Sequence, residues 1–258
     1  MLYKNQTVSL VIVDTDSYKL AKNAVDRTLE VFPVDEVLVF SDEPSQWKGY
    51  SVILIEKIRT IRDYNEIILK VLPEYLKTDY ALIIQYDGFV INPNCWSDFF
   101  FNFDYIGAPW PAGEVFGREA IVGNGGFSLR SKKIIENSVK YLQSYDFALP
   151  EDALVCRIFR PSLEEIDRVI FAPVEVARHF SFELEPIGDV KPFGFHGLFP
   201  LSWVYRDEWE FLLENLPERC FKMGSFHLRC LTRGFSKLDS DAQISLAEKV
   251  NQLSLKTD

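Results

Sequence analysis

The first half of the chain alternates short apolar runs with longer stretches in which apolar residues recur every three or four positions. An apolar, β-branched run is typical of a strand buried on both faces, and the wider spacing is typical of an amphipathic helix. Strands that alternate with helices predict βα units and a mostly parallel sheet. The predicted strands are Val8–Val13, Glu36–Phe40, Tyr50–Ile55 and Tyr80–Gln85.

Two helices are predicted between these strands. Asp16 or Ser17 can cap the first helix, which ends at Pro33. The second covers Tyr64–Leu76, and because Pro73 lies inside it we expect a bend or a division there.

The second half is less regular, and its elements are predicted from shorter patterns. No internal repeat and no linker divides the chain, so we expect one α/β domain over residues 1–235 and a polar C-terminal segment, 236–258. The pattern predicts a short helix in Asn92–Phe103, a strand and an aromatic turn in Asp104–Pro111, a loop at Ala112–Ala120, helices at Ser131–Tyr145 and Pro150–Phe159, strand-like stretches in Pro173–Phe182, a turn at Phe193–Gly197 and a weakly amphipathic helix near Ala242–Leu253.

Charge, cysteines and hydropathy restrict the partners. The 258 residues include 28 Lys and Arg against 38 Asp and Glu, and a net charge of −10 argues against nucleic acid as the main partner. The four cysteines are widely spaced without a C-x-x-C pair, so neither a zinc site nor a disulfide framework is indicated. No apolar run reaches the length of a membrane span or a signal-peptide core. We expect a soluble, cytoplasmic protein, and peripheral association with a membrane stays open.

Three aspartates follow predicted strands. Asp14, Asp42 and Asp87 each lie just past an apolar run. Because the carboxyl ends of parallel strands meet at one edge of an open α/β sheet, where ligands bind, we expect these three side chains to face one cleft. The alternative is that Asp serves here only to end strands and cap helices.

Two motifs combine glycine with polar side chains. In Gln85–Gly88, the carboxylate of Asp87 at a strand end can hold Mg²⁺ or Mn²⁺, and the glycine permits a close backbone approach. Gly123–Ser128 has three glycines in four positions, and Asn124 offers both a donor and an acceptor. This segment can lie against a ligand, or it can be a tight turn that leads into a helix.

Two further motifs contain titratable groups. Glu151 and Asp152 begin a predicted helix, where they are favourable charges on the helix dipole or a general base poised to accept a proton. His196 lies between glycine and aromatic residues in Phe193–Gly197. It is a candidate for contact with a metal or a phosphate, or a packed turn histidine.

In their order along the chain, these motifs resemble those of glycosyltransferases of the GT-A fold. The segments IIQYDGFVINP, YIGAPWP, GNGGFSLRS, PEDALVC, FAPVEVARHFSFE and FGFHG, from Leu82 to Gly197, are similar to a bacterial glycosyltransferase-like family of unassigned activity. The resemblance implies an α/β fold of GT-A (Rossmann-like) type with a central mixed, mostly parallel sheet flanked by helices. It also implies a hexosyltransferase-like enzyme that moves a sugar, with inversion, from a UDP-linked nucleotide-sugar donor. The acceptor would be a saccharide or a lipid-linked saccharide, in the synthesis of cell-surface polysaccharide or glycan.

The resemblance also implies roles for single residues. Asp87 and His196 would meet Mn²⁺ or Mg²⁺, Asp152 would be the general base and Glu151 would orient the acceptor. The rings of Trp110 and Phe127 would stack on sugar faces. Together with Asp14 and Asp42 at the strand ends and the basic Arg62, we expect Gln85 and Asp87 to bind the donor. The expected substrate-binding residues are Trp110, Asn124, Gly125, Gly126 and Phe127.

One position departs from the family pattern. The family has an acid at the first position of its D-x-D motif, whereas this chain has Gln85, which keeps an oxygen but loses a charge. This change should weaken metal binding. Metal-independent action therefore stays open, with the diphosphate held by basic side chains, for which the candidates are Arg59, Arg62, Lys70 and Arg118.

Two other classes of function are alternatives. Because of Gln85, the chain could be a non-catalytic carbohydrate-binding or assembly protein that kept the fold. A sugar-nucleotide pyrophosphorylase shares the nucleotide-binding half. However, that class usually has a glycine-rich basic signature after its first strand, and VDTDSYK at positions 13–19 contains no glycine.

Overall fold

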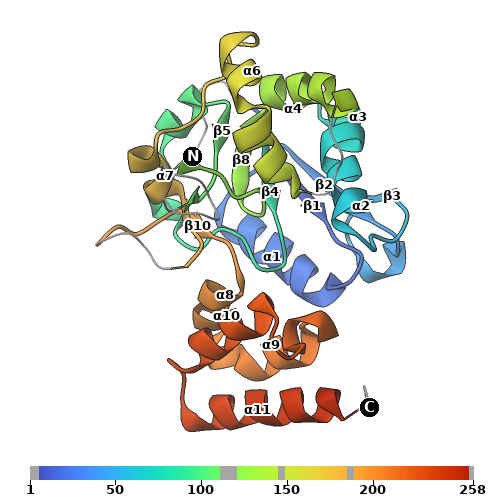
Figure 1. The fold of residues 1–258 in the computed structure, drawn as a ribbon, viewed down its shortest axis with the longest axis vertical. Helices are drawn as coiled ribbons and strands as arrows, with labels where there is room; N and C mark the ends of the chain where they lie inside the picture. Colours follow the sequence, from blue (N-terminus) through green and yellow to red (C-terminus); the bar gives the residue numbers. More distant parts are fainter. Residues whose placement is uncertain (1–5, 111–120, 145–148, 185–188, 256–258) are drawn as a thin grey trace.

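A six-stranded mixed sheet forms the centre of the protein (Figure 1). The computed structural model describes residues 6–110, 121–144, 149–184 and 189–255, so the loop predicted at Ala112–Ala120 lies outside the described residues. The strand order is β3-β2-β1-β4-β8-β5; β3, β2, β1 and β4 run parallel, and β8 is antiparallel to both β4 and β5. The bounds are β1 (Val8–Val13), β2 (Glu36–Ser41), β3 (Val52–Leu54), β4 (Tyr80–Ile84), β5 (Tyr105–Ile106) and β8 (Ser128–Ser131).

The two central parallel strands form the core of the sheet. Every residue of β1 and β4 is buried, and Val11 pairs with Leu38 of β2 on one side and Ile83 of β4 on the other. Helices cover the sheet, so these strands need apolar side chains on both faces, which explains their unbroken apolar runs. The predicted class, α/β with a central mixed and mostly parallel sheet flanked by helices, is confirmed.

Helices and short strands complete the fold. The helices are α1 (Tyr18–Val31), α2 (Ile61–Glu66), α3 (Leu72–Tyr75), α4 (Lys132–Ser138), α5 (Glu151–Ala153), α6 (Arg160–Glu165), α7 (Val174–Phe180), α8 (Leu198–Val204), α9 (Trp209–Asn215), α10 (Phe226–Phe235) and α11 (Ser240–Ser254). Two small sheets pair β6 (Pro109–Trp110) with β7 (Ile121–Val122) and β9 (Ser181–Phe182) with β10 (Gly194–Phe195). Segments of 3₁₀-helix lie at Pro44–Gln46, Pro93–Cys95, Asp98–Asn102, Val139–Ser144, Arg206–Glu208 and Glu218–Phe221, and π-helix lies at Ile67–Val71 and Leu154–Ile158.

The two predicted helices of the first half are present, but the way the first begins and the way the second accommodates Pro73 differ from the prediction. Ser17 is the N-cap of α1, but its side chain makes no capping bond; the carboxylate of Asp14 accepts the backbone N–H of Ser17 instead. The second helix is continuous from α2 to α3 through the π segment Ile67–Val71. Pro73 lies inside this continuous helix, directly after the π turn, where the regular i→i−4 bonding is already interrupted.

Several predictions for the second half were wrong in element type. Asn92–Phe103 forms two 3₁₀ segments rather than one helix. Pro173–Phe182 is mostly the helix α7, which begins after Pro173, and only its last two residues form a strand. The helix predicted at Ser131–Tyr145 ends as α4 at Ser138 and continues as 3₁₀-helix to Ser144.

A layer of four helices, α8 to α11, lies against one end of the α/β body (Figure 1). The sequence patterns missed α8, α9 and α10. In the structure α10 packs on α8 and α11, α11 also contacts α9, and Ala242 and Leu246 of α11 are buried. The boundary predicted at residues 235/236 thus falls between two helices in contact. Within the described residues, none of the helices is long and apolar enough to cross a membrane.

Candidate active site

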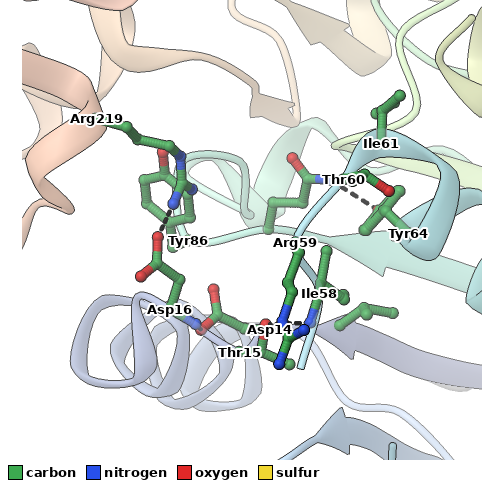
Figure 2. Close-up of a pocket in the computed structure, with 12 residues that line it drawn as sticks. Asp14, Thr15, Asp16, Ile58, Arg59, Thr60, Ile61, Tyr64, Tyr86 and Arg219 are labelled. Atoms are coloured by element: carbon green, nitrogen blue, oxygen red, sulfur yellow. Dashed lines mark hydrogen bonds and ion pairs between the residues drawn. The ribbon is translucent and has the colours of Figure 1, made fainter. Parts of the chain in front are cut away.

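A pocket of about 310 Å³, which we call the rim pocket, opens at the carboxyl ends of β1 and β4 (Figure 2). Its walls come from four parts of the chain: the turn after β1, the segment that leads into α2, the turn after β4, and the helical layer. The polar lining residues are Asp14, Thr15, Asp16, Arg59, Thr60, Tyr64, Gln85, Tyr86 and Arg219.

Asp14 is a buried carboxyl group in the wall of the rim pocket. It is 7% exposed, and its Oδ1 accepts backbone N–H groups from Asp16 at 3.0 Å and Ser17 at 2.7 Å. Burial raises the pKa of Asp14 to about 7, and the negative charges of Asp87 and Asp42 add to the rise, whereas the bond from Ser17 opposes it. The group therefore exchanges its proton near neutral pH.

The three aspartates gather at one edge of the sheet but do not share one pocket. Asp14 lines the rim pocket, whereas Asp87 lines a neighbouring pocket of about 90 Å³, which we call the His196 pocket. Asp42 lines neither, and its Oδ1 accepts the hydroxyl of Tyr18 at 2.8 Å. The expectation of one cleft for all three is corrected in this respect, because Tyr18 of α1 holds Asp42 aside.

The His196 pocket is lined by both polar and apolar residues. Its polar residues are Asp87, Glu183, His196 and His227, and its apolar residues are Leu184, Leu198, Phe199, Phe226 and Cys230. Burial raises the pKa of Glu183, and the charge on Asp152 contributes to the rise. Glu183 thus lies within electrostatic reach of the predicted base.

A chain of hydrogen bonds joins the two pockets. Gln85 donates to the hydroxyl of Tyr64 at 2.7 Å and meets Nε2 of His196 through Oε1 at 3.2 Å. Nδ1 of His196 lies 2.8 Å from the amide nitrogen of Asn124. Because that nitrogen only donates, Nδ1 accepts, and the proton of the neutral imidazole is on Nε2, where it faces Gln85.

Asp87 completes a cluster of donor atoms. Its Oδ1 lies 3.7 Å from Nε2 of His196 and is buried without a hydrogen-bond partner. A buried carboxylate oxygen without a partner is costly, and it points to a missing ligand. Three atoms that can bind a cation, on Gln85, Asp87 and His196, therefore face one another. Within the described ranges, no group of three or more His, Cys, Asp and Glu suits a metal ion, so this set depends on the amide oxygen of Gln85.

Two glycines of the Gly123–Ser128 segment make room for the cluster. A Cβ on Gly126 would lie 2.1 Å from Nε2 of His196, and a Cβ on Gly125 would lie 2.0 Å from Oε1 of Glu151. Asn124 takes a positive φ of 61°, which Asn tolerates better than most residues. The side chain of Asn124 and the backbone of Gly125 bond to other residues of the site, so this segment forms its framework.

Glu151 has a different position from the one expected. It is 2% exposed, and its two carboxylate oxygens accept both terminal nitrogens of Arg130 at 2.7 Å. Arg130, on β8, also donates to Ser128 at 3.0 Å and to the carbonyl of Gly125 at 3.4 Å. The role of orienting an acceptor is corrected, because both carboxylate oxygens of Glu151 are engaged by Arg130 in a buried ion pair.

Asp152 is half-buried beside this ion pair. Its Oδ2 accepts the backbone N–H of Gly125 at 2.9 Å, and its Oδ1 accepts that of Ala153 at 2.7 Å. Burial raises the pKa of Asp152, and the charge of Glu151 adds to the rise, whereas the two backbone bonds oppose it. A raised pKa is what a general base near neutral pH needs.

Three other predicted contacts do not survive in the structure. Phe127 is fully buried and stacks on Phe180, with ring centroids 5.0 Å apart, so it belongs to the core and not to a sugar platform. Trp110 is 5% exposed, because the backbone at Gly123 packs against its indole ring. Arg62 is exposed on α2 and does not line the rim pocket, whereas Arg59 does. Arg118 lies outside the described residues.

Sequence reasoning also missed three charged residues of the site. The sequence could have indicated Arg130, because a charged residue next to an apolar one in a short buried strand needs a buried partner of opposite charge. Glu183 and Arg219 had no such signal, since only the tertiary fold brings them to the pockets.

The buried ion pair gives a test of stability. Glu151→Gln leaves the Arg130 charge uncompensated in the interior, so we expect the free energy of unfolding to fall by about 3–5 kcal/mol in urea denaturation. The matched control is Glu164→Gln, which removes an acid from the exposed Arg160–Glu164 pair at 2.8 Å and should cost about 1 kcal/mol or less. Equal losses in the two variants would contradict the structural role given to Glu151.

Asp14 gives a test of pH dependence. Between its ordinary pKa of 3.8 and its folded pKa of about 7, the folded protein retains a proton that the unfolded chain releases. This group's stabilising contribution is therefore complete below about pH 4 and lost as the pH rises to about 7. In Asp14→Asn this loss is absent, so the variant should gain stability relative to the wild type from pH 4 to 7 and keep a constant difference above pH 7. Melting temperatures from pH 4 to 9 measure it, and a pH-independent difference would refute the raised pKa.

Comparison with known proteins identifies a family whose model matches the middle of the chain. Residues 49–196 match the model of a family described as a protein of unknown function, DUF5672. This region contains most of the motifs quoted above between Leu82 and Gly197. No curated protein matches the chain.

Similar solved structures include glycosyltransferases, at low sequence identity. One is a glycosyltransferase involved in the glycosylation of the major capsid of PBCV-1; it is 14% identical, with a TM-score of 0.46, over 74% of this chain and 93% of that chain. Another is glucosyl-3-phosphoglycerate synthase from Mycobacterium tuberculosis in complex with Mn²⁺, UDP-glucose and phosphoglyceric acid, which is 11% identical, with a TM-score of 0.41, over 63% of this chain and 67% of that chain. The same synthase with glycerol 3-phosphate is 12% identical, with a TM-score of 0.37, over 50% and 58% of the two chains. The family model covers more than half of this chain, which therefore belongs to the DUF5672 family.

Proposed function

We propose that this protein is a glycosyltransferase that moves a hexosyl group from a nucleotide-sugar donor, UDP-linked, to the hydroxyl of a saccharide or lipid-linked saccharide. The observation that carries the proposal is the unpartnered Oδ1 of Asp87, which is buried beside Gln85 and His196 where two pockets meet. A cluster of this kind suits a divalent cation, and the pocket on one side is large enough for part of a nucleotide.

The donor atoms present fit Mn²⁺ or Mg²⁺. Asp87, His196 and Gln85 would hold the ion, and the buried oxygen of Asp87 would gain the partner that it lacks. When bound, such a cation neutralises the negative charge that develops on a diphosphate leaving group. Binding through Nε2 requires the proton of His196 on Nδ1, so the amide of Asn124, whose nitrogen lies 2.8 Å from Nδ1, would have to turn its oxygen toward the ring.

The rim pocket would take the nucleoside diphosphate. Asp14 can accept a hydrogen bond from an imide N–H such as that of uracil, because its carboxyl group lines the pocket. Arg59 and Arg219 line the same pocket, and arginine is well suited to phosphate oxygens. Gln85 lies in the wall between this pocket and the His196 pocket, so the diphosphate would lie close to the cation ligands.

The acceptor would approach from the side of Asp152. Its carboxylate would take the proton of the acceptor hydroxyl while the hydroxyl oxygen attacks the anomeric carbon and the bond to the diphosphate breaks, which gives inversion. Arg130 and Glu151 would hold Asp152 through Gly125. Glu183 and Phe226 line the neighbouring pocket, where a carboxylate can accept sugar hydroxyls and an aromatic ring can pack on sugar C–H groups.

A non-catalytic carbohydrate-binding protein is the second candidate. The neutral Gln85 favours it, because Oε1 is already engaged with His196 and the cluster has one carboxylate fewer than the family pattern. Release of UDP from UDP-sugars, with or without an acceptor, separates the two candidates, since only an enzyme turns over.

Asp87→Asn tests the cation site. Without the carboxylate charge, Mn²⁺-dependent binding of UDP should weaken at least about tenfold in calorimetry, and UDP release should fall to background. Stability should change little or rise, because the oxygen that is replaced has no hydrogen-bond partner. Asp42→Asn is the matched control, since Asp42 lies at the same edge of the sheet but lines neither pocket. Unchanged Mn²⁺ dependence in the Asp87 variant would exclude the cation site.

Asp152→Asn tests the base. The amide keeps the shape and one acceptor oxygen, so UDP binding should persist, whereas transfer should fall by about 10²–10⁴-fold. Glu175→Gln in the first turn of α7 is the control for an acid whose role is limited to a helix start. If Asp152→Asn behaves like Glu175→Gln, with normal turnover and a small change in melting temperature, then Asp152 is not the base.

A further inference from the structure

An ion pair crosses the rim pocket between the two layers of the protein. Arg219 belongs to the 3₁₀ segment Glu218–Phe221 of the helical layer, and Asp16 lies in the turn between β1 and α1 (Figure 2). Both side chains line the pocket, and their carboxylate and guanidinium groups are in contact. About half of each side chain is exposed, at 49% and 44%, so the pair is open to solvent.

The charge on Arg219 acts on both pockets. Its guanidinium lies 6.0 Å from the ring centroid of Tyr86, which follows Gln85 at the end of β4. It opposes the effect of burial on the pKa of Asp14 in the rim pocket. Burial is the main cause of the lowered pKa of His227 in the His196 pocket, and the charge on Arg219 adds to it. Arg219 therefore lines the rim pocket beside the turn that follows β4, and its charge reaches groups in both pockets.

We propose that Asp16 occupies the diphosphate position on Arg219 while the site is empty, and that a bound nucleoside diphosphate displaces it. This inference rests on the proposed function of the same pocket. The carboxylate of Asp16 and a phosphate group present the same pair of acceptor oxygens to the guanidinium fork. Arg219 is then the cation on the helical-layer side of the diphosphate, opposite Arg59.

The energetics favour exchange. An exposed ion pair between single charges is weak, so breaking the contact with Asp16 costs little. A diphosphate brings more charge and more acceptor oxygens to the same guanidinium. Gln85 stands where the D-x-D motif has its first acid, so the proposed metal site has one charged ligand fewer and should bind its ion more weakly. A positively charged side chain near the diphosphate, such as Arg219, is then needed more.

The test is the binding of UDP, inorganic pyrophosphate and uridine, measured by calorimetry on the full chain with Mn²⁺. Asp16→Ala should tighten UDP and pyrophosphate binding by about 1.5- to 5-fold, which corresponds to the strength of an exposed ion pair. Arg219→Ala should weaken both by about tenfold or more, and the double variant should match Arg219→Ala. Uridine, which has no phosphate, should bind all variants equally.

A matched control separates the contact from overall charge. Glu164→Ala also removes one exposed acid with an arginine partner, but on α6 and outside both pockets, so it should leave all three affinities unchanged. If Asp16→Ala leaves UDP binding unchanged or weakens it, or tightens it equally in the Arg219→Ala background, the inference is overturned.

The outcomes also distinguish this inference from the proposed function. In one outcome, pyrophosphate binds, its affinity changes in both variants, UDP binds no more tightly than pyrophosphate, and no UDP-sugar is turned over. The anion site then stands and the proposed transferase activity fails. If UDP-sugars are turned over with Asp16→Ala and Arg219→Ala indistinguishable from the wild type, the transferase stands and this inference fails. If neither UDP nor pyrophosphate binds to the wild type or to Asp16→Ala, both fail.

Discussion

Arg130 and Glu151 place two opposite charges in the interior of the protein, where neither is solvated by water. Their paired oxygens and nitrogens, each 2.7 Å apart, compensate for that loss only while the fork stays aligned. The alignment ties β8 to the start of α5 and fixes the carbonyl of Gly125 through Arg130. Since the N–H of Gly125 in turn holds Asp152, the orientation of the proposed base depends on an ion pair buried in the interior.

The glycines show how closely the two halves of the site fit. Gly126 packs where a side chain would overlap His196, and Gly125 packs where one would overlap Glu151. The segment that was predicted to face substrate thus packs between the proposed cation ligands and the proposed base. Under the proposed function, substrate would meet the side chains that this segment positions.

The sequence was most informative where one local pattern decides the structure. β1 and β4 are buried on both faces, so their apolar runs identified them, and the carboxyl ends of these strands indicated where Asp14 and Asp87 would gather. Phe127 could not be assigned in this way, because an aromatic residue next to glycine looks the same whether it faces a ligand or Phe180. Trp110 lies between two prolines, and no periodic pattern there shows which way its ring faces. Arg219 had no local signal, since its position depends on helices α8 to α10, whose short apolar patterns were not recognised.

The reversed direction of β8 has a consequence for how the site is assembled as the chain folds. Because β8 runs antiparallel to β4, the residues that precede it meet the residues that follow β4 at one edge. The bond between Gln85 and His196 spans 111 positions of the sequence, and Asp16 and Arg219 are still farther apart. The pairings of β1 with β2 and β4 span 27 and 72 positions, so the edge that carries Gln85 and His196 depends on contacts that close longer loops. The candidate site is thus made of contacts with a higher sequence separation than those that align the sheet beneath it.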